Sequence, residues 1–321
     1  MGKSGGSTRH VELETKFDVR DDAVSPSFEG LAAVARVEKH PTANLEAVYF
    51  DTANHNLAAN WVTLRRRTGG HDAGWHLKLP AGAARTEIHA PLGPDDGRPP
   101  EDLLDVVRAI VRDRRLVRVA HLATARDITM LYGPGGEALA EFSDDRVSAR
   151  RIDPGDGSTV HELQWREWEL ELVEASLKDG AAVLDRLANR LFDAGAAPAD
   201  HGSKLAKVLG DAVPRKPEPP SDPVHRAVAE QVGKLLEWDR AVRADGDDAV
   251  HQMRVTIRQI RSLLQASEGE FGLTDDATIL TELRELAGVL GMARDAEVLA
   301  DRYREALDAM EPELIRGPVR E

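Results

Sequence analysis

The chain has 321 residues, no cysteine and a formal net charge of −14 at pH 7. Without cysteine it cannot form disulfides, thiolate metal sites or thiol nucleophiles, and its negative charge argues against broad nucleic-acid binding, which requires net phosphate neutralisation. No apolar run approaches the roughly 18 residues of a membrane span and no apolar signal segment opens the chain, so we expect a cytoplasmic protein without a membrane partner.

The first strand pattern follows a short polar segment, residues 1–9, which we expect to be a flexible tail. It reads His10-Val-Glu-Leu-Glu-Thr-Lys-Phe17. Because side chains alternate along a strand, Glu12, Glu14 and Lys16 share one face. Two carboxylates on one face can hold a divalent cation, and a neighbouring lysine can meet a phosphate. A solvated strand face with mixed charges gives the same string, so the interpretation depends on the rest of the chain.

Further strand-like segments carry the same mixture of charges on one face. Arg65 and Arg67 are two residues apart, Lys78 lies between apolar neighbours, and three acids alternate at Glu167, Glu169 and Glu171. An ordinary antiparallel sheet places its charges in solvent. Charges of both signs on many strands also fit a closed sheet with a polar interior.

The charged residues, taken in order, resemble the CYTH family, the triphosphate tunnel metalloenzymes, over roughly residues 10 to 208. The matching pieces are Glu12-x-Glu14-x-Lys16, Arg65-x-Arg67, Lys78, Arg85-x-Glu87, Arg126, Asp144, Glu169-x-Glu171 and Ser203-Lys204. The resemblance implies an α+β fold over residues 10–209, in which an eight-stranded antiparallel β-tunnel is flanked by helices.

The resemblance also implies a division of roles among these residues. The expected substrate-binding residues are Lys16, Arg65, Arg67, Lys78, Glu87, Arg126 and Lys204. The expected ligands of Mg²⁺ or Mn²⁺ are Glu12, Glu14, Asp144, Glu169 and Glu171, with Glu14 and Lys16 as the catalytic pair. Phosphoryl transfer depends mainly on positioning and charge stabilisation, so no side-chain nucleophile is needed. Two points stay open: Glu87 could pair with Arg85 within the wall, and His76 stands where the family often has a threonine.

After residue 209 the composition changes. Residues 210–223 contain five prolines and are expected to form a semi-rigid linker. Beyond the linker, a 3.6-residue periodicity predicts an all-α bundle with helices near residues 224–244, 248–267, 275–291 and 294–310.

The second of these predicted helices carries two stripes. Its apolar stripe consists of Met253, Ile257, Ile260 and Leu264, and its basic stripe consists of His251, Arg254, Arg258 and Arg261. A solvated basic face is the simpler interpretation. With the later Leu286-Ala-Gly-x-Leu-Gly-x-x-Arg-Asp295, however, the segment resembles the CHAD domain, which implies binding of inorganic polyphosphate. That family has a pair of related bundles, so we expect residues 224–321 to be a truncated CHAD-like domain.

The CYTH–CHAD order resembles the inorganic triphosphatase family. It implies metal-dependent hydrolysis of a linear triphosphate, most simply of tripolyphosphate to pyrophosphate and phosphate. Two alternatives stay open. One is a polyphosphate sensor or tether without efficient turnover, and the other is a CYTH enzyme acting on thiamine triphosphate or on ATP as an adenylate cyclase.

Overall fold

A computed structural model describes residues 7–81, 84–93, 97–173, 180–215, 217–244, 246–273 and 278–311. The chain divides into two compact units, Met1–Lys216 and Pro217–Glu321. Residues 1–6 of the tail that we expect to be flexible lie outside the described residues, and the first strand begins within the remainder of that tail, at Thr8.

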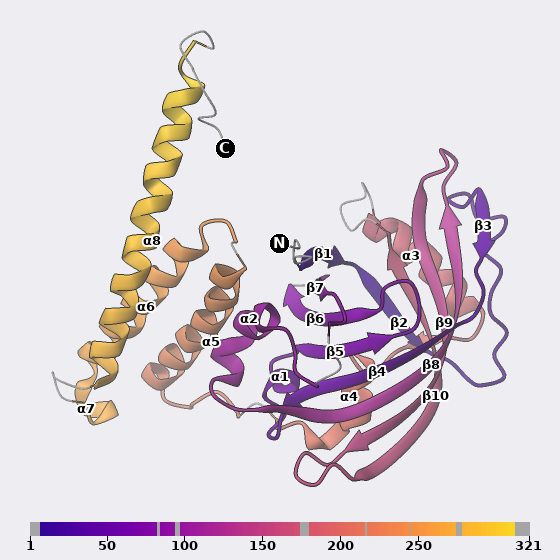
Figure 1. Cartoon of the computed structure of the whole chain (residues 1–321), viewed down its shortest axis with the longest axis horizontal. Coiled ribbons are helices and arrows are strands. Elements are labelled where there is room, and N and C mark those ends of the chain that lie inside the picture. The colour runs from indigo at the N-terminus through magenta and orange to yellow at the C-terminus, as the bar shows by residue number, and fades with distance from the viewer. Residues whose placement is uncertain are drawn as a thin grey trace. The chain divides into compact units, whose positions relative to one another are not determined.

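The first unit is built around one antiparallel sheet (Figure 1). Its hydrogen-bonded path runs β1-β7-β6-β5-β4-β8-β9-β10-β2-β11, and β3 pairs with β8. The strands are β1 (Thr8–Glu12), β2 (Glu14–Asp18), β3 (Arg36–Lys39), β4 (Ala43–Thr52), β5 (Thr63–Thr68), β6 (Gly74–Ala81), β7 (Ala84–Ala90), β8 (Leu116–Tyr132), β9 (Ala138–Ile152), β10 (Thr159–Leu172) and β11 (Ala197–Pro198). Only Leu13 separates β1, which pairs with β7, from β2, which pairs with β10. The N-terminal segment therefore closes the sheet around an interior.

The antiparallel sheet with flanking helices is confirmed, but its count of eight strands is corrected to eleven. The difference has a local cause at each extra strand. Leu13 interrupts the first strand and divides it into β1 and β2, while the short strands β3 and β11 pair with β8 and β2 outside the closed path. When β1 and β2 are taken together, the closed path itself has the expected eight members.

In the described part of this unit, four α-helices accompany the sheet: α1 (Asn56–Ala59), α2 (Glu101–Val111), α3 (Gly180–Asp193) and α4 (Lys204–Leu209). The apolar faces of α2 and α3 are buried against the sheet, with Leu103 beside the Trp75 cluster and Leu187 beside the Trp168 cluster. Helix α4 instead packs Leu205 and its apolar neighbours against inward residues of β4, β8 and β9. It begins at the N-cap Ser203, and this packing places Lys204 at the interior of the sheet.

The second unit is helical and consists of α5 (Pro223–Arg243), α6 (Ala249–Ala266), α7 (Glu268–Phe271) and α8 (Thr278–Asp308). The proline at the first position of α5 is compatible with a helix start, and Asp222 caps that helix. The apolar stripe of α6 is buried, as predicted. Among the described residues, no helix is both long enough and apolar enough to cross a bilayer.

The predicted break between the last two helices is wrong. Helix α8 runs without interruption through Gly291 and Arg294. A glycine within a helix costs only about 1 kcal/mol relative to alanine. The residues beside Gly291, Leu290, Met292 and Ala293, are strong helix formers, so the single glycine does not end the helix. The start of the predicted helix at residues 275–277 lies outside the described residues.

Candidate functional site

The interior of the closed sheet contains a cavity of about 950 Å³. All seven predicted substrate-binding residues line it, from strands β2, β5, β6, β7 and β8 and from helix α4: Lys16, Arg65, Arg67, Lys78, Glu87, Arg126 and Lys204. Four predicted metal ligands line the same cavity: Glu12, Glu14, Glu169 and Glu171. The structure thus brings together residues that are up to 192 positions apart, counted from Glu12 to Lys204.

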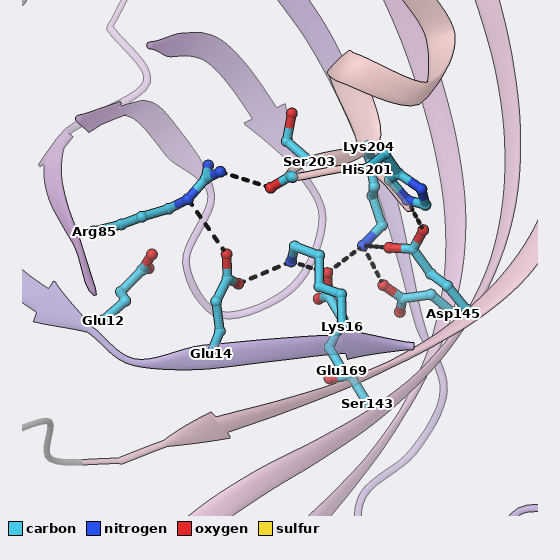
Figure 2. Close-up of polar contacts among 12 residues, drawn as sticks. Glu12, Glu14, Lys16, Arg85, Ser143, Asp145, Glu169, His201, Ser203 and Lys204 are labelled. Carbon is cyan, nitrogen blue, oxygen red and sulfur yellow. Dashed lines mark hydrogen bonds and ion pairs between the residues drawn. The ribbon is translucent and has the colours of Figure 1, made fainter. Parts of the chain in front are cut away.

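Lys16 lies between two carboxylates (Figure 2). Its Nζ donates to Glu14 Oε2 at 2.9 Å and also contacts Glu169. Although burial opposes ionisation of Glu14, the charges of Lys16 and Lys78 lower the pKa of this carboxyl to about 2. The same carboxylates raise the pKa of Lys16 against the effect of its burial. Both groups are therefore charged at neutral pH, and the ammonium is held inside the cavity.

A second network surrounds Glu169. Lys204 Nζ lies 2.8 Å from both Asp145 Oδ2 and Glu169 Oε1, and 2.6 Å from Glu167 Oε1. Arg126 makes a bidentate contact with Asp145 at 2.8 and 2.6 Å and reaches Glu169 at 2.7 Å. Figure 2 shows Lys16 and Lys204 both pointing at Glu169. These carboxylates hold three cations in place before any phosphate arrives.

Two neighbouring arginines, Arg65 and Arg67, line another part of the cavity. Arg65 donates to the Tyr49 hydroxyl at 3.4 Å and lies 3.8 Å from Glu87 Oε1, while Arg67 contacts Asp72. Burial and the neighbouring Arg65 and Arg126 lower the pKa of Arg67 to about 9. A guanidinium that is destabilised by other cations gains when an anion binds beside it, so this wall suits a phosphate.

Three carboxylates form a row across the opposite strands. Glu171 on β10 is the direct register partner of Glu141 on β9 and of Glu14 on β2, and all three line the cavity. No described residue gives Glu171 a hydrogen bond or an ion pair. Burial, with Glu12, Glu14 and Glu169 nearby, raises the pKa of Glu171 to about 7. Directly opposed like charges are destabilising, and carboxylate oxygens are the ligands that Mg²⁺ and Mn²⁺ prefer. The row therefore fits a divalent metal ion.

The family follows from a comparison with known domains. A model of the CYTH domain matches residues 10–190. This chain belongs to the CYTH family. A model of the CHAD domain matches residues 226–321, so a CHAD domain follows the CYTH domain. CYTH enzymes act on triphosphates and depend on metal ions, and the acidic residues of this CYTH domain could hold such an ion.

Two uncharacterized proteins of Mycobacterium tuberculosis, one from strain CDC 1551 and one from strain H37Rv, are each 61% identical to the chain over 324 residues. The matches cover 98% of this chain, which spans 63% of the length of these relatives. Among solved structures, a candidate adenylate cyclase from Bacillus halodurans is 15% identical with a TM-score of 0.43, covering 63% of this chain and 99% of that one. A protein from Pyrococcus horikoshii OT3 is 16% identical with a TM-score of 0.37, covering 62% and 99%.

Asp144, which we expected among the metal ligands, does not join the site of this CYTH domain. It lies on the outer face of β9, where Arg166 donates to its two oxygens at 2.8 and 2.6 Å. Because side chains alternate along a strand, the inward positions of β9 are Glu141, Ser143 and Asp145. The expectation for Asp144 is therefore corrected, and Glu141 takes its place in the row of acids.

The structure also shows the contacts of Glu167 and His76, two residues that the sequence draws attention to without assigning them a role in the site. Glu167 is fully buried and holds Lys204 and His201, at 2.6 and 3.4 Å. His76 bonds Glu87 at 3.0 Å through Nδ1 and the Asp72 carbonyl oxygen at 2.9 Å through Nε2. The alternation Glu141-x-Ser143-x-Asp145 is visible in the sequence. It could have identified the inward set only with the register of β9 against β10.

We expect Glu141→Gln to weaken Mn²⁺ binding by about tenfold or more, because it removes one charge from the carboxylate row. Asp144→Asn should leave the Mn²⁺ affinity unchanged and lower the stability instead, because it weakens a buried contact with Arg166. Calorimetric Mn²⁺ titrations and urea unfolding of both variants measure the two effects separately. The opposite pattern, with Mn²⁺ binding lost only in Asp144→Asn, would show that Asp144 is a metal ligand after all.

The predicted polyphosphate residues lie on α6 of the helical unit. His251 and Arg258 are exposed, and Arg254 and Arg261 are partly buried. The basic stripe borders the buried apolar stripe that packs against α5 and α8. It is available on the surface of that unit, but no described contact assigns it a ligand.

Proposed function

We propose that the chain hydrolyses a linear triphosphate with the help of a divalent metal ion, and that inorganic tripolyphosphate is its substrate. The observation that supports this most is the shared cavity, in which seven buried or partly buried lysine and arginine side chains face a row of carboxylates. A triphosphate carries several negative charges, and the cations would replace its hydration with fixed charge. Guanidinium groups match phosphate oxygens in bidentate fashion, and ammonium groups act as point charges.

Each part of the cavity has its own task in this proposal. Arg65, Arg67 and Lys78 bind the end of the triphosphate that is not cleaved, because an anion there relieves the repulsion of Arg67 by Arg65 and Arg126. Lys16 and Lys204 release part of their contact with Glu169 and bind the phosphoryl group that is transferred. These contacts stabilise charge that spreads over the phosphoryl oxygens as the bond breaks.

The carboxylates would hold the metal ion and orient water. We propose Glu12, Glu14, Glu169 and Glu171 as ligands, with Glu141 from the inward face of β9. A bound divalent ion supplies charge neutralisation at the phosphate oxygens and lowers the pKa of a coordinated water molecule. Glu14 also accepts from Lys16, so it links the metal position to the cation that meets the phosphate.

One observation favours a second candidate, an organic triphosphate. The cavity is also lined by apolar side chains, among them Leu45, Ile128 and Met130. These residues offer no partner for phosphate oxygens, but they could accept the organic part of thiamine triphosphate or ATP. Tripolyphosphate remains the first proposal because the adjoining CHAD domain, in the same proposal, binds polyphosphate.

A substrate panel separates these candidates. The full chain is incubated with Mg²⁺ or Mn²⁺ and with tripolyphosphate, ATP or thiamine triphosphate, and released phosphate and cyclic AMP are measured. We expect the highest kcat/KM with tripolyphosphate and its loss in Glu14→Gln. A preference for ATP or thiamine triphosphate would replace tripolyphosphate by the organic candidate, and tight polyphosphate binding without any turnover would favour the sensor.

We further propose that the basic stripe of α6 binds inorganic polyphosphate. The double variant Arg254→Gln/Arg258→Gln should weaken binding of long-chain polyphosphate by about tenfold or more and flatten its salt dependence, because two phosphate contacts are lost. Hydrolysis of tripolyphosphate should stay unchanged. Fluorescence titrations at several salt concentrations, with Arg304→Gln as an exposed control on α8, test this. If Arg304→Gln weakened polyphosphate binding equally, the effect would come from the overall charge and not from the basic stripe.

A further inference from the structure

Three ligand-type side chains converge at one edge of the cavity, on the neighbouring strands β1 and β7. His10 is the direct register partner of Glu87, and Glu12 lies on the same face of β1. His10 Nε2 lies 3.4 Å from Glu12 Oε1 and 3.2 Å from Glu87 Oε2. One atom from each residue lies within 4.8 Å of the other two. The carboxylates are 4% and 5% exposed, and all three residues line the cavity.

In both Glu12 and Glu87, the carboxylate oxygen that does not contact His10 is held by another residue. Lys78 donates to Glu12 Oε2 at 2.6 Å, and His76 Nδ1 lies 3.0 Å from Glu87 Oε1. The hydrogen bonds from Lys78 and His76 end on those two atoms, and the other oxygen of each carboxylate lies beside His10. Burial, together with the neighbouring Glu87, raises the pKa of Glu12. Partners that hold one oxygen and leave the other free are a common feature of metal ligands.

The spacing also fits a coordination sphere. Metal–ligand bonds of about 2.1 Å place neighbouring ligand atoms about 3.0 Å apart in an octahedron and about 3.4 Å apart in a tetrahedron. The His10 nitrogen lies 3.2 and 3.4 Å from the two oxygens. A protonated His10 paired with the two acids is the competing explanation. Both contacts lie within ion-pair distance, so the two explanations are separated by the presence or absence of a metal–nitrogen bond.

We propose that His10, Glu12 and Glu87 form a binding site for a divalent transition-metal ion of the Mn²⁺, Fe²⁺ or Zn²⁺ class. One imidazole nitrogen and two carboxylate oxygens favour such ions over Mg²⁺, which strongly prefers oxygen ligands. The site shares Glu12 with the metal ligands proposed above, but His10 and Glu87 are not among those ligands and lie on other strands than the row of Glu14, Glu141 and Glu171. It adjoins Arg65 and Lys78, so its role toward phosphate rests on the proposed function, whereas metal binding does not.

Mn²⁺ electron paramagnetic resonance tests the site directly. The full chain is loaded with Mn²⁺ without any triphosphate, and pulsed spectra are examined for ¹⁴N coupling from an imidazole. We expect coupling in the unchanged chain, its loss in His10→Gln, and its persistence in His40→Gln, since His40 lines the same cavity away from this site. Mn²⁺ affinity at the coupled site should fall at least tenfold in His10→Gln, and excess Mg²⁺ should displace the uncoupled Mn²⁺ first.

Two results would overturn the site. One is bound Mn²⁺ without nitrogen coupling, as expected if His10 is only a protonated partner, and the other is coupling that persists in His10→Gln. Because the spectra need no turnover, failure here is separable from failure of the proposed function. If the chain hydrolyses triphosphate but shows no nitrogen coupling, the proposed function holds and the His10 site is wrong. If it shows coupling but no hydrolysis, the metal site holds and the proposed function is wrong.

Discussion

Replacing Lys16 with methionine is expected to lower kcat/KM for triphosphate hydrolysis by about 10²–10³-fold, the effect of removing one preorganised charge donor from an enclosed site. Methionine preserves most of the side-chain volume but removes the ammonium that lies between Glu14 and Glu169. Glu169 keeps Arg126 and Lys204 as partners, so the sheet should still close. Phosphate release measures the activity, and circular dichroism checks the fold.

Lys207→Met is the matched control. Lys207, like Lys16, forms an ion pair, with Asp18 at 2.7 Å, but it does not line the cavity. Its replacement should change kcat/KM less than twofold. If Lys16→Met kept activity within a factor of two of the unchanged chain, Lys16 would have no place in the reaction.

Asp145→Ala should destabilise the CYTH domain by about 3–5 kcal/mol, because it removes the carboxylate shared by two buried cations. Asp145 is 0% exposed, accepts a bidentate contact from Arg126 and lies 2.8 Å from Lys204. The remaining carboxylates, Glu167 and Glu169, cannot replace the bidentate geometry. Urea unfolding followed by the fluorescence of the buried tryptophans measures the change.

Asp127→Ala on the adjacent strand serves as the comparison. Its carboxylate lies 3.4 Å from Arg146, and both side chains are about half exposed, at 48% and 56%. Exposed pairs of this kind contribute about 0–1 kcal/mol, so this variant should unfold close to the unchanged chain. Equal losses in the two variants would show that the buried network has no special share in stability.

Five of the six predicted cations lie in strands whose alternation is plain in the sequence, and only Lys204 lies on a helix, α4. Lys16 follows two acids at two-residue spacing, and Arg65 and Arg67 share a face in the same way. Strand alternation therefore assigns their faces without any tertiary information. Residues of the same face gather in one cavity only because the N-terminal segment closes the sheet, and the family resemblance supplied that closure.

The β9 acids show where such reasoning fails. Asp144 and Asp145 are adjacent in the sequence, so one must point inward and the other outward. No local signal says which, because both are buried and both have arginine partners. Only the pairing of Glu171 with Glu141 fixes the faces. A register error of one residue exchanges every side chain of a strand between the two faces.

The continuous helix α8 was missed for a different reason. Gly291 and Arg294-Asp295 resemble a helix end followed by a helix start. The glycine alone costs only about 1 kcal/mol relative to alanine, and its neighbours Leu290, Met292 and Ala293 are strong helix formers. The summed propensity of the segment therefore outweighs one weak break signal, and the helix continues.

The most direct measurement is a ³¹P nuclear magnetic resonance time course of tripolyphosphate with the full chain and Mg²⁺ or Mn²⁺. We expect equimolar phosphate and pyrophosphate, with no products after chelation of the metal or in Lys16→Met. Tripolyphosphate that binds the cavity but stays intact, under conditions where the chain is folded and metal-loaded, would contradict hydrolysis and leave a protein that only captures the polyanion.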